Sequence, residues 1–218
     1  MKKLFSLISL LFLIGVNVFA QSHISSQAHQ AAISMISSGN IEDGFENIYF
    51  SAGKDGFLVK WTDDNNGEHY QITELEIKMI SVSPNGKEIA VYETDGGLIN
   101  RVSVWNWETL TRKFARRFSD SVTSISYTAN GNYIMVGTAT VDGVVFLRSS
   151  NGDVVSNKIR ESTGIVSYAI TSKTEKTAVM YSPAGSLAYY NLFTGRLTKK
   201  FNVEQGLSNT VLFNNYLF

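Results

Sequence analysis

Short apolar runs alternate with turn residues along most of this chain. Runs such as Glu88–Tyr92, Tyr133–Val136 and Thr177–Tyr181 are apolar at successive positions, so both faces of the corresponding strand are apolar. Asn-Gly and Asp-Gly pairs stand between the runs, and such pairs favour tight hairpins because both positions accept positive φ. Hairpins make the strands antiparallel. The pattern therefore predicts small antiparallel sheets that are covered on both faces.

The strand pattern repeats at a nearly constant interval. The third strand of each repeat ends at a bulky residue, and these residues (Trp61, Trp105, Leu147 and Tyr190) are 44, 42 and 43 positions apart. Four-stranded propeller blades have a period of about 40–45 residues. We predict an all-β chain, a β-propeller of four-stranded antiparallel blades. The blades are expected at 29–75, 77–117, 121–159 and 164–202, with the start of a fifth at 206–218, so the ring is incomplete.

Two segments resemble the WD-repeat family of β-propellers. Ser51–Trp61 is similar to the family's second-to-third-strand segment, and Ser81–Lys87 is similar to its first-to-second-strand turn. The resemblance covers residues 29–218 and implies a propeller built from such repeats. Ser83–Glu93 is equally similar to the propellers of TolB-like and oligopeptidase-type proteins, which are the nearest rivals.

The repeats also depart from the WD-repeat pattern. The family's Gly-His pair is echoed only by Ala28-His29, and the Trp-Asp ending of a repeat is Trp61-Thr62 in the first copy and Trp105-Asn106 in the second. The resemblance implies a buried His–Ser/Thr–Asp–Trp hydrogen-bond network, which we therefore expect to be incomplete in most blades.

An incomplete ring leaves open sheet edges, and open edges invite pairing with other chains. A seven-bladed ring needs roughly 300 residues at this period. We expect the chain to be a fragment or truncated form of a longer propeller, or to be closed by a partner chain or by self-association through the open edges. A membrane-spanning barrel is disfavoured because its strands need about 9–11 residues with a polar inner face.

The N-terminus has the features of a secretory signal peptide at 1–20. Lys2 and Lys3 precede an apolar run, and Val18-Phe19-Ala20 offers a cleavage site before Gln21. The apolar run is shorter than the roughly 20 residues that a membrane-spanning helix needs. Residues 21–28 then form a polar lead-in. We expect a bacterial protein that is periplasmic or secreted, without a membrane span after cleavage.

Composition and charge exclude several classes of protein. Hydrophobic residues make up 44% of the chain and charged residues 17%, which excludes a disordered chain. Cysteine is absent, so disulfides and thiolate chemistry are excluded. Residues 21–110 carry 5 basic and 13 acidic residues, whereas residues 111–218 carry 12 basic and 6 acidic residues. Neither half is basic enough to indicate nucleic-acid binding.

The sequence offers no catalytic signature, and we assign no catalytic, cofactor-binding or metal-binding residue. The three histidines, His23, His29 and His69, lack metal-ligand spacing. A Ser–His–Asp triad stays open as an alternative, because folding can gather its members from distant positions. The acidic run Asp63–Glu68 resembles a calcium loop, but Thr62 and Thr73 stand where that loop needs acids. We interpret this run as a turn.

Two surface features are candidates for contact with partners. One is the basic cluster Arg112, Lys113, Arg116 and Arg117, which suits an acidic partner or a nucleic acid, or protects an edge strand from unwanted pairing. We favour edge protection. The other is the hairpin Thr94–Asn100, which is longer than its counterpart in the first repeat. Loops on a rigid scaffold commonly carry function.

These observations favour an exported, non-enzymatic propeller that binds a protein or peptide through its rim turns and central funnel. No cofactor and no nucleic acid is expected. One alternative is a part of a periplasmic propeller enzyme or sensor whose active groups lie in other blades or in another domain. Another is a binder of small ligands in the central funnel.

Overall fold

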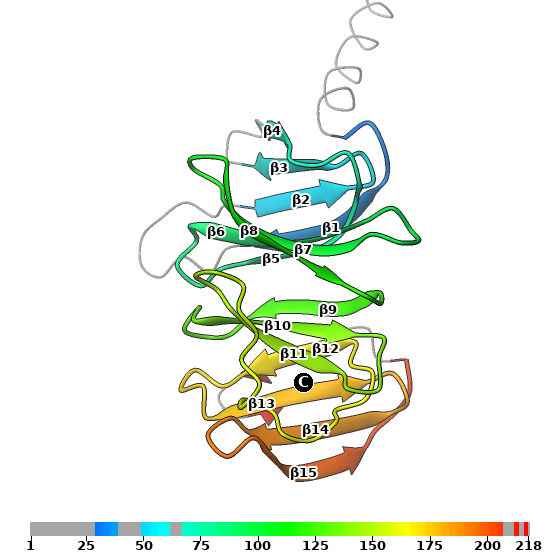
Figure 1. Ribbon diagram of the computed structural model, residues 1–218, viewed down its shortest axis with the longest axis vertical. Helices are drawn as coiled ribbons and strands as arrows, with labels where there is room; N and C mark the ends of the chain where they lie inside the picture. Colours follow the sequence, from blue (N-terminus) through cyan, green and yellow to red (C-terminus); the bar gives the residue numbers. More distant parts are fainter. Residues whose placement is uncertain (1–28, 39–48, 62–66, 207–211, 214–215, 218) are drawn as a thin grey trace, which may run out of the picture.

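The computed structural model describes residues 29–38, 49–61, 67–206, 212–213 and 216–217. All regular structure in these residues is β-strand, and it forms four successive sheets and a short hairpin (Figure 1). The strands of the first sheet are β1 (Ile33–Ser38), β2 (Tyr49–Gly53), β3 (Phe57–Trp61) and β4 (Gly67–Gln71). The strands of the second sheet are β5 (Glu76–Val82), β6 (Glu88–Thr94), β7 (Asn100–Asn106) and β8 (Thr111–Phe118).

The third and fourth sheets follow in chain order. The third consists of β9 (Val122–Tyr127), β10 (Tyr133–Thr138) and β11 (Val144–Arg148). The fourth consists of β12 (Tyr168–Thr171), β13 (Thr177–Ser182), β14 (Ser186–Asn191) and β15 (Arg196–Asn202). The hairpin is β16 (Leu212–Phe213) and β17 (Tyr216–Leu217), at the expected start of a fifth blade.

Every strand within a sheet pairs antiparallel with its neighbour in the chain, so each sheet is a simple meander. Figure 1 shows the four sheets stacked along the long axis of the molecule, with β4 near one end and β15 at the other. The propeller fold expected from the sequence is confirmed. The sheets do not close a ring within the described residues.

The third sheet differs from the expected pattern at its outer edge. The blade expected at 121–159 was predicted to have four strands, but its last segment, Asp153–Ile159, contributes only a single bridge between Leu147 and Val154. Two backbone hydrogen bonds flank this bridge, from Val155 to Phe146 and from Arg148 to Asp153, both 2.8 Å long. The chain then leaves the edge of β11 through a turn at 156–157.

Apolar cores lie between consecutive sheets, which explains the strands that are apolar on both faces. On β6, Ile89 and Val91 pack in the core shared with the first sheet, whereas Ala90 and Tyr92 pack in the core shared with the third. A further core joins the third and fourth sheets around Phe146. Burying one such large side chain stabilises the fold by about 1.5–3 kcal/mol, so each sheet depends on its neighbours for its stability.

The first strands of successive sheets lie next to one another. β1 contacts β5, β5 contacts β9, and β9 contacts β12. Two hydroxyl groups on β9 bond to the next sheet: Thr123 donates to the Val166 carbonyl at 2.6 Å, and Ser126 donates to the Ala169 carbonyl at 2.7 Å. These strands are therefore the inner strands of the propeller, and their ends define its central face.

Candidate binding cleft

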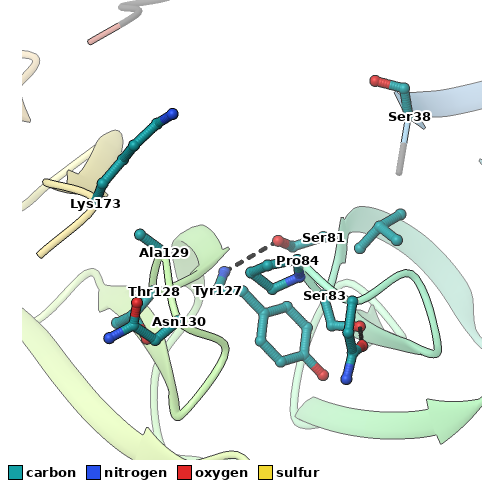
Figure 2. Close-up of a pocket in the computed structure, with 11 residues that line it drawn as sticks. Ser38, Ser81, Ser83, Pro84, Tyr127, Thr128, Ala129, Asn130 and Lys173 are labelled. Carbon is teal, nitrogen blue, oxygen red and sulfur yellow. Dashed lines mark hydrogen bonds between the residues drawn. The ribbon is translucent and has the colours of Figure 1, made fainter. Parts of the chain in front are cut away.

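A cleft of about 810 Å³ opens at one end of the inner strands (Figure 2). The turns that follow β5, β9 and β12 contribute to its wall, together with the end of β1. Its lining residues are Ser38, Ser81, Val82, Ser83, Pro84, Asn85, Tyr127, Thr128, Ala129, Asn130 and Lys173. Figure 2 shows Ser38 and Lys173 on opposite sides of the open space.

The turn between β5 and β6 is held by its own side chains. Ser83 donates a hydrogen bond to Asn85 Oδ1 at 2.7 Å and accepts one from the Glu88 amide at 2.9 Å. Asn85 Oδ1 also accepts from the Lys87 amide at 3.1 Å. Gly86 has a φ of 68°, which favours glycine and allows its amide to reach the Ser83 carbonyl at 2.9 Å. The Asn-Gly pair in the sequence is thus the physical reason for this turn.

The turn between β9 and β10 is tied to the sheets on both sides. The Tyr127 amide donates to Ser81 Oγ at 3.1 Å, in the second sheet. The amides of Ala129 and Asn130 donate to Thr171 Oγ1 at 2.8 Å and to Glu175 Oε1 at 2.9 Å, in the fourth sheet. These bonds fix the relative positions of three turns, so the cleft is preorganised for a ligand.

Tyr127 forms part of the cleft floor and is buried. Its hydroxyl donates to Glu88 Oε2 at 3.4 Å. Burial, and secondarily the negative charge of Glu88, raise the pKa of Tyr127 far above its ordinary value, so the phenol stays neutral at physiological pH. No His, Asp or Glu is among the described residues that line the cleft. The arrangement is suited to binding through hydrogen bonds and one ammonium group.

A second polar cluster lies inside the first sheet and joins a Ser, a His and an Asp. His29 Nε2 lies 2.8 Å from Ser51 Oγ, and His29 Nδ1 lies 3.1 Å from Asp55 Oδ1. Trp61 Nε1 donates to Ser51 Oγ at 2.9 Å. The hydrogen-bond network expected from the WD-repeat resemblance is therefore complete in this sheet.

This cluster has the connectivity of a catalytic triad but not its accessibility. Ser51 is 1% exposed, and its oxygen already accepts a hydrogen bond from Trp61. Burial raises the pKa of Asp55, but hydrogen bonds from His29 and from the Phe57 and Gln30 amides outweigh it and lower the pKa below its ordinary value. The cluster ties the chain before β1 to the β2–β3 hairpin, and a substrate cannot reach its hydroxyl group in this conformation.

The second sheet has a different cluster at the equivalent place. Trp105 Nε1 donates to Ser103 Oγ at 2.9 Å, and Ser103 donates to Glu93 Oε1 at 2.7 Å. Arg101 donates to Glu93 Oε2 at 2.7 Å. Burial raises the pKa of Glu93, but the hydrogen bonds from Arg101, Thr73 and Ser103 lower it below its ordinary value. A carboxylate from β6 and an arginine thus replace the Asp and His of the first sheet.

The remaining candidate residues are dispersed. His23 and most of the turn at 63–67 lie outside the described residues, and His69 lies on β4. No group of three or more potential metal ligands occurs in the part of the chain that the structure describes. No helix among the described residues is long and apolar enough to cross a bilayer.

The basic cluster lies on β8, the outer edge of the second sheet. Lys113 pairs with Glu88 at 2.5 Å, Arg116 donates to the Gly152 carbonyl at 3.3 Å, and Arg112 stacks over Trp105. Much of this cluster is therefore used within the molecule. The hairpin Thr94–Asn100 holds Leu98 almost fully exposed at its tip.

The sequence analysis placed contacts on rim turns and in a central funnel but named no cleft residues. The signal was present in the repeats themselves. Ser83-Pro84-Asn85 and Thr128-Ala129-Asn130 occupy the same position after the first strand of their repeats, as does Thr171–Lys176. Superposing the repeats would have brought these turns to the same end of the molecule.

Fold and cleft together define a β-propeller module with a polar opening on its central face. The sequence matches, over residues 18–218, a protein family described as an N-terminal beta-propeller domain, and the chain belongs to that family. An uncharacterized protein of Treponema pallidum (strain Nichols) is 38% identical to it over 171 residues. The aligned part is 78% of this chain and 28% of that protein, so the chain spans about 28% of the length of the relative it matches.

Proposed function

We propose that this chain is an exported, non-enzymatic propeller that binds a protein or peptide in the cleft at the end of its inner strands. The observation that carries the proposal is the 810 Å³ cleft whose walls come from the turns of three successive sheets. A cleft of this size is within the range of ligand sites, about 300–1,000 Å³. The hydrogen bonds between its turns reduce the ordering that binding would require.

Membership of the WD-repeat family is part of the same proposal. The support is the cluster of His29, Ser51, Asp55 and Trp61, which matches the network that the resemblance implies. The cluster of the second sheet departs from it. Because propellers carry many functions, this kinship supports the architecture of a binding scaffold rather than any particular partner.

A second candidate function follows from the longer relative. The chain aligns with 28% of that protein, so the propeller is proposed alternatively as the N-terminal part of a periplasmic enzyme or sensor. In that case the cleft would bind a substrate or a signalling ligand. The catalytic or signalling groups would then lie in another part of the longer protein.

Selection of peptides from a displayed library tests binding in the cleft. We expect enriched peptides to bind the wild-type protein and to lose at least about tenfold in affinity for Ala129→Trp, which adds a bulky ring to the cleft lining. Asn130→Trp, at an exposed position on the same turn, is a second way to fill the opening. Circular dichroism and thermal melting show whether each variant is folded. If no peptide is enriched, or if peptides bind both folded variants as well as wild type, the proposal is wrong.

Export is tested separately. Expression of the full chain in a bacterial host and mass spectrometry of the periplasmic fraction should find a mature N-terminus at Gln21. A chain that stays in the cytoplasm with Met1 intact would contradict export without bearing on the cleft.

A further inference from the structure

Three polar side chains of the cleft lining already form hydrogen bonds that hold their own turns. Asn85 Oδ1 accepts two hydrogen bonds, from Ser83 and from the Lys87 amide, which leaves the side-chain NH2 group for a ligand. Ser83 both donates and accepts within the turn, and Thr128 donates to the Tyr133 carbonyl and accepts from the Tyr133 amide. Neither hydroxyl has a hydrogen left for a ligand.

Two further donors point to the same chemistry. Ser81 Oγ accepts from the Tyr127 amide, so its hydroxyl hydrogen is free to be donated. Lys173 is exposed on the turn after β12 and forms no ion pair with any described residue. In Figure 2 its side chain extends along one side of the opening. The donors thus come from the second and fourth sheets, on two sides of the cleft.

Two carboxylates bond to residues of the cleft lining, although neither lines it. Glu88 pairs with Lys113 and accepts from Tyr127. Glu175, on the same turn as Lys173, accepts from the Asn130 amide and keeps its negative charge, so it offsets part of the charge of Lys173. Val82, Pro84 and Ala129 add an apolar part to the lining. The lining therefore combines one cation, several neutral polar groups and a small apolar surface.

We propose that this cleft recognises a carboxylate of a peptide, with Lys173, the Asn85 amide and the Ser81 hydroxyl as its donors. This inference rests on the proposed peptide-binding function. Charge-assisted hydrogen bonds to a carboxylate are about twice as strong as neutral ones. The carboxylate comes either from an acidic side chain or from a peptide C-terminus, and the apolar lining contacts the chain beside it.

Fluorescence anisotropy with defined peptides tests the inference on the full folded chain. The probe is a labelled, C-terminally amidated octapeptide of alternating glutamate and valine. Its neutral match has glutamine in place of glutamate. At roughly 50 mM salt we expect the glutamate peptide to bind about tenfold more tightly than its match, and we expect the difference to shrink as salt screens the charges. A free-acid form of the glutamine peptide measures recognition of a C-terminal carboxylate.

Lys173→Gln should reduce the preference for the glutamate peptide by about three- to fivefold, which is the size expected for an exposed charge pair. Lys176→Gln is the matched control, because it removes the same charge from the same turn but does not line the cleft. Equal affinities for the glutamate and glutamine peptides would overturn the inference and leave peptide binding intact. If no peptide binds the folded protein, both the inference and the proposed function fail.

Discussion

In each of the first two sheets, one buried serine hydroxyl group forms hydrogen bonds with two other side chains of the same blade. Ser51 accepts from Trp61 Nε1 and lies within hydrogen-bonding distance of His29 Nε2, although neither partner is a neighbour of Ser51 in the chain. A buried donor or acceptor that loses its partner destabilises a fold by about 1–3 kcal/mol. These positions are therefore sensitive, even though each is a small polar residue in an apolar surrounding.

Ser51→Ala should lower the free energy of unfolding by about 2–3 kcal/mol, because it leaves both His29 Nε2 and Trp61 Nε1 without their partner. Urea titration followed by tryptophan fluorescence measures the change. Ser34→Ala, at an exposed position on β1, is the control and should shift stability by less than about 0.5 kcal/mol. Equal midpoints for the two variants would mean that the cluster contributes nothing to stability.

The carboxylate of Glu93 gives stability a pH dependence. Its pKa in the folded protein lies below the ordinary value of 4.5. The ionised form therefore stabilises the fold above pH 4.5, and this contribution is lost as the pH falls through the folded-state pKa. Glu93→Gln should lower stability by about 2 kcal/mol at neutral pH, because it leaves Arg101 unpaired.

The free energy of unfolding of Glu93→Gln should fall less than that of wild type as the pH is lowered from 5 to 3. The reason is that the variant lacks one group that titrates in this range. Asp55 has a lowered pKa as well and keeps part of the acid dependence in both proteins. Urea midpoints measured across this range test the prediction. Parallel pH profiles for the two proteins would contradict it.

Hairpins differ in how closely other segments approach them. Gly96 and Gly143 stand in the β6–β7 and β10–β11 hairpins with φ values of 80° and 79°, so both backbones favour glycine equally. A methyl group on Gly143 would collide with the Thr163 hydroxyl and the Gly164 carbonyl oxygen. A methyl group on Gly96 would have no heavy atom within 4 Å.

Gly96→Ala should cost about 1 kcal/mol, which is the effect of positive φ alone. Gly143→Ala should cost about 2 kcal/mol more, because the segment around Thr163 must move. Thermal melting gives the stabilities, and limited proteolysis should show faster cleavage near residues 156–165 only in Gly143→Ala. If the two variants lost equal stability, the close approach would have no energetic effect.

The strand pattern was predictable because it depends on local chemistry. Asn-Gly pairs produced the expected turns, and apolar residues on both faces of β6 predicted packing between two sheets. The missing outer strand of the third sheet was not predictable from this pattern. Asp153–Ile159 has the composition of a strand, but its departure from β11 accompanies contacts of later residues, such as the Thr163 hydroxyl that accepts from the Val144 amide.

The candidate cleft was less predictable than the fold. Its residues are far apart in the sequence and meet only because the inner strands of successive sheets lie side by side. The Glu93–Arg101 pair was also missed, since neither residue matches the pattern of the WD-repeat family. Glu93 stands in a run of buried residues on β6. A glutamate within such an apolar strand is the signal that could have revealed the pair.

The whole molecule is a row of sheets in which each core is shared by two neighbours. Leu58 lies in the core between the first and second sheets, and Met180 lies in the core between the third and fourth. In such arrays stability is approximately a sum of the stabilities of the units and of the interfaces between neighbours. A cavity in one core should therefore loosen the two sheets that share it and leave distant sheets protected.

Leu58→Ala should cost about 2–5 kcal/mol locally and raise amide hydrogen exchange in β1–β8, with little change in β12–β15. Met180→Ala is the mirror control and should raise exchange in β9–β15 while the first sheet stays protected. Hydrogen-exchange mass spectrometry on both variants resolves the two halves. If each variant raised exchange equally in all four sheets, the row would unfold as one cooperative unit, and nearest-neighbour packing would not be the main determinant of its stability.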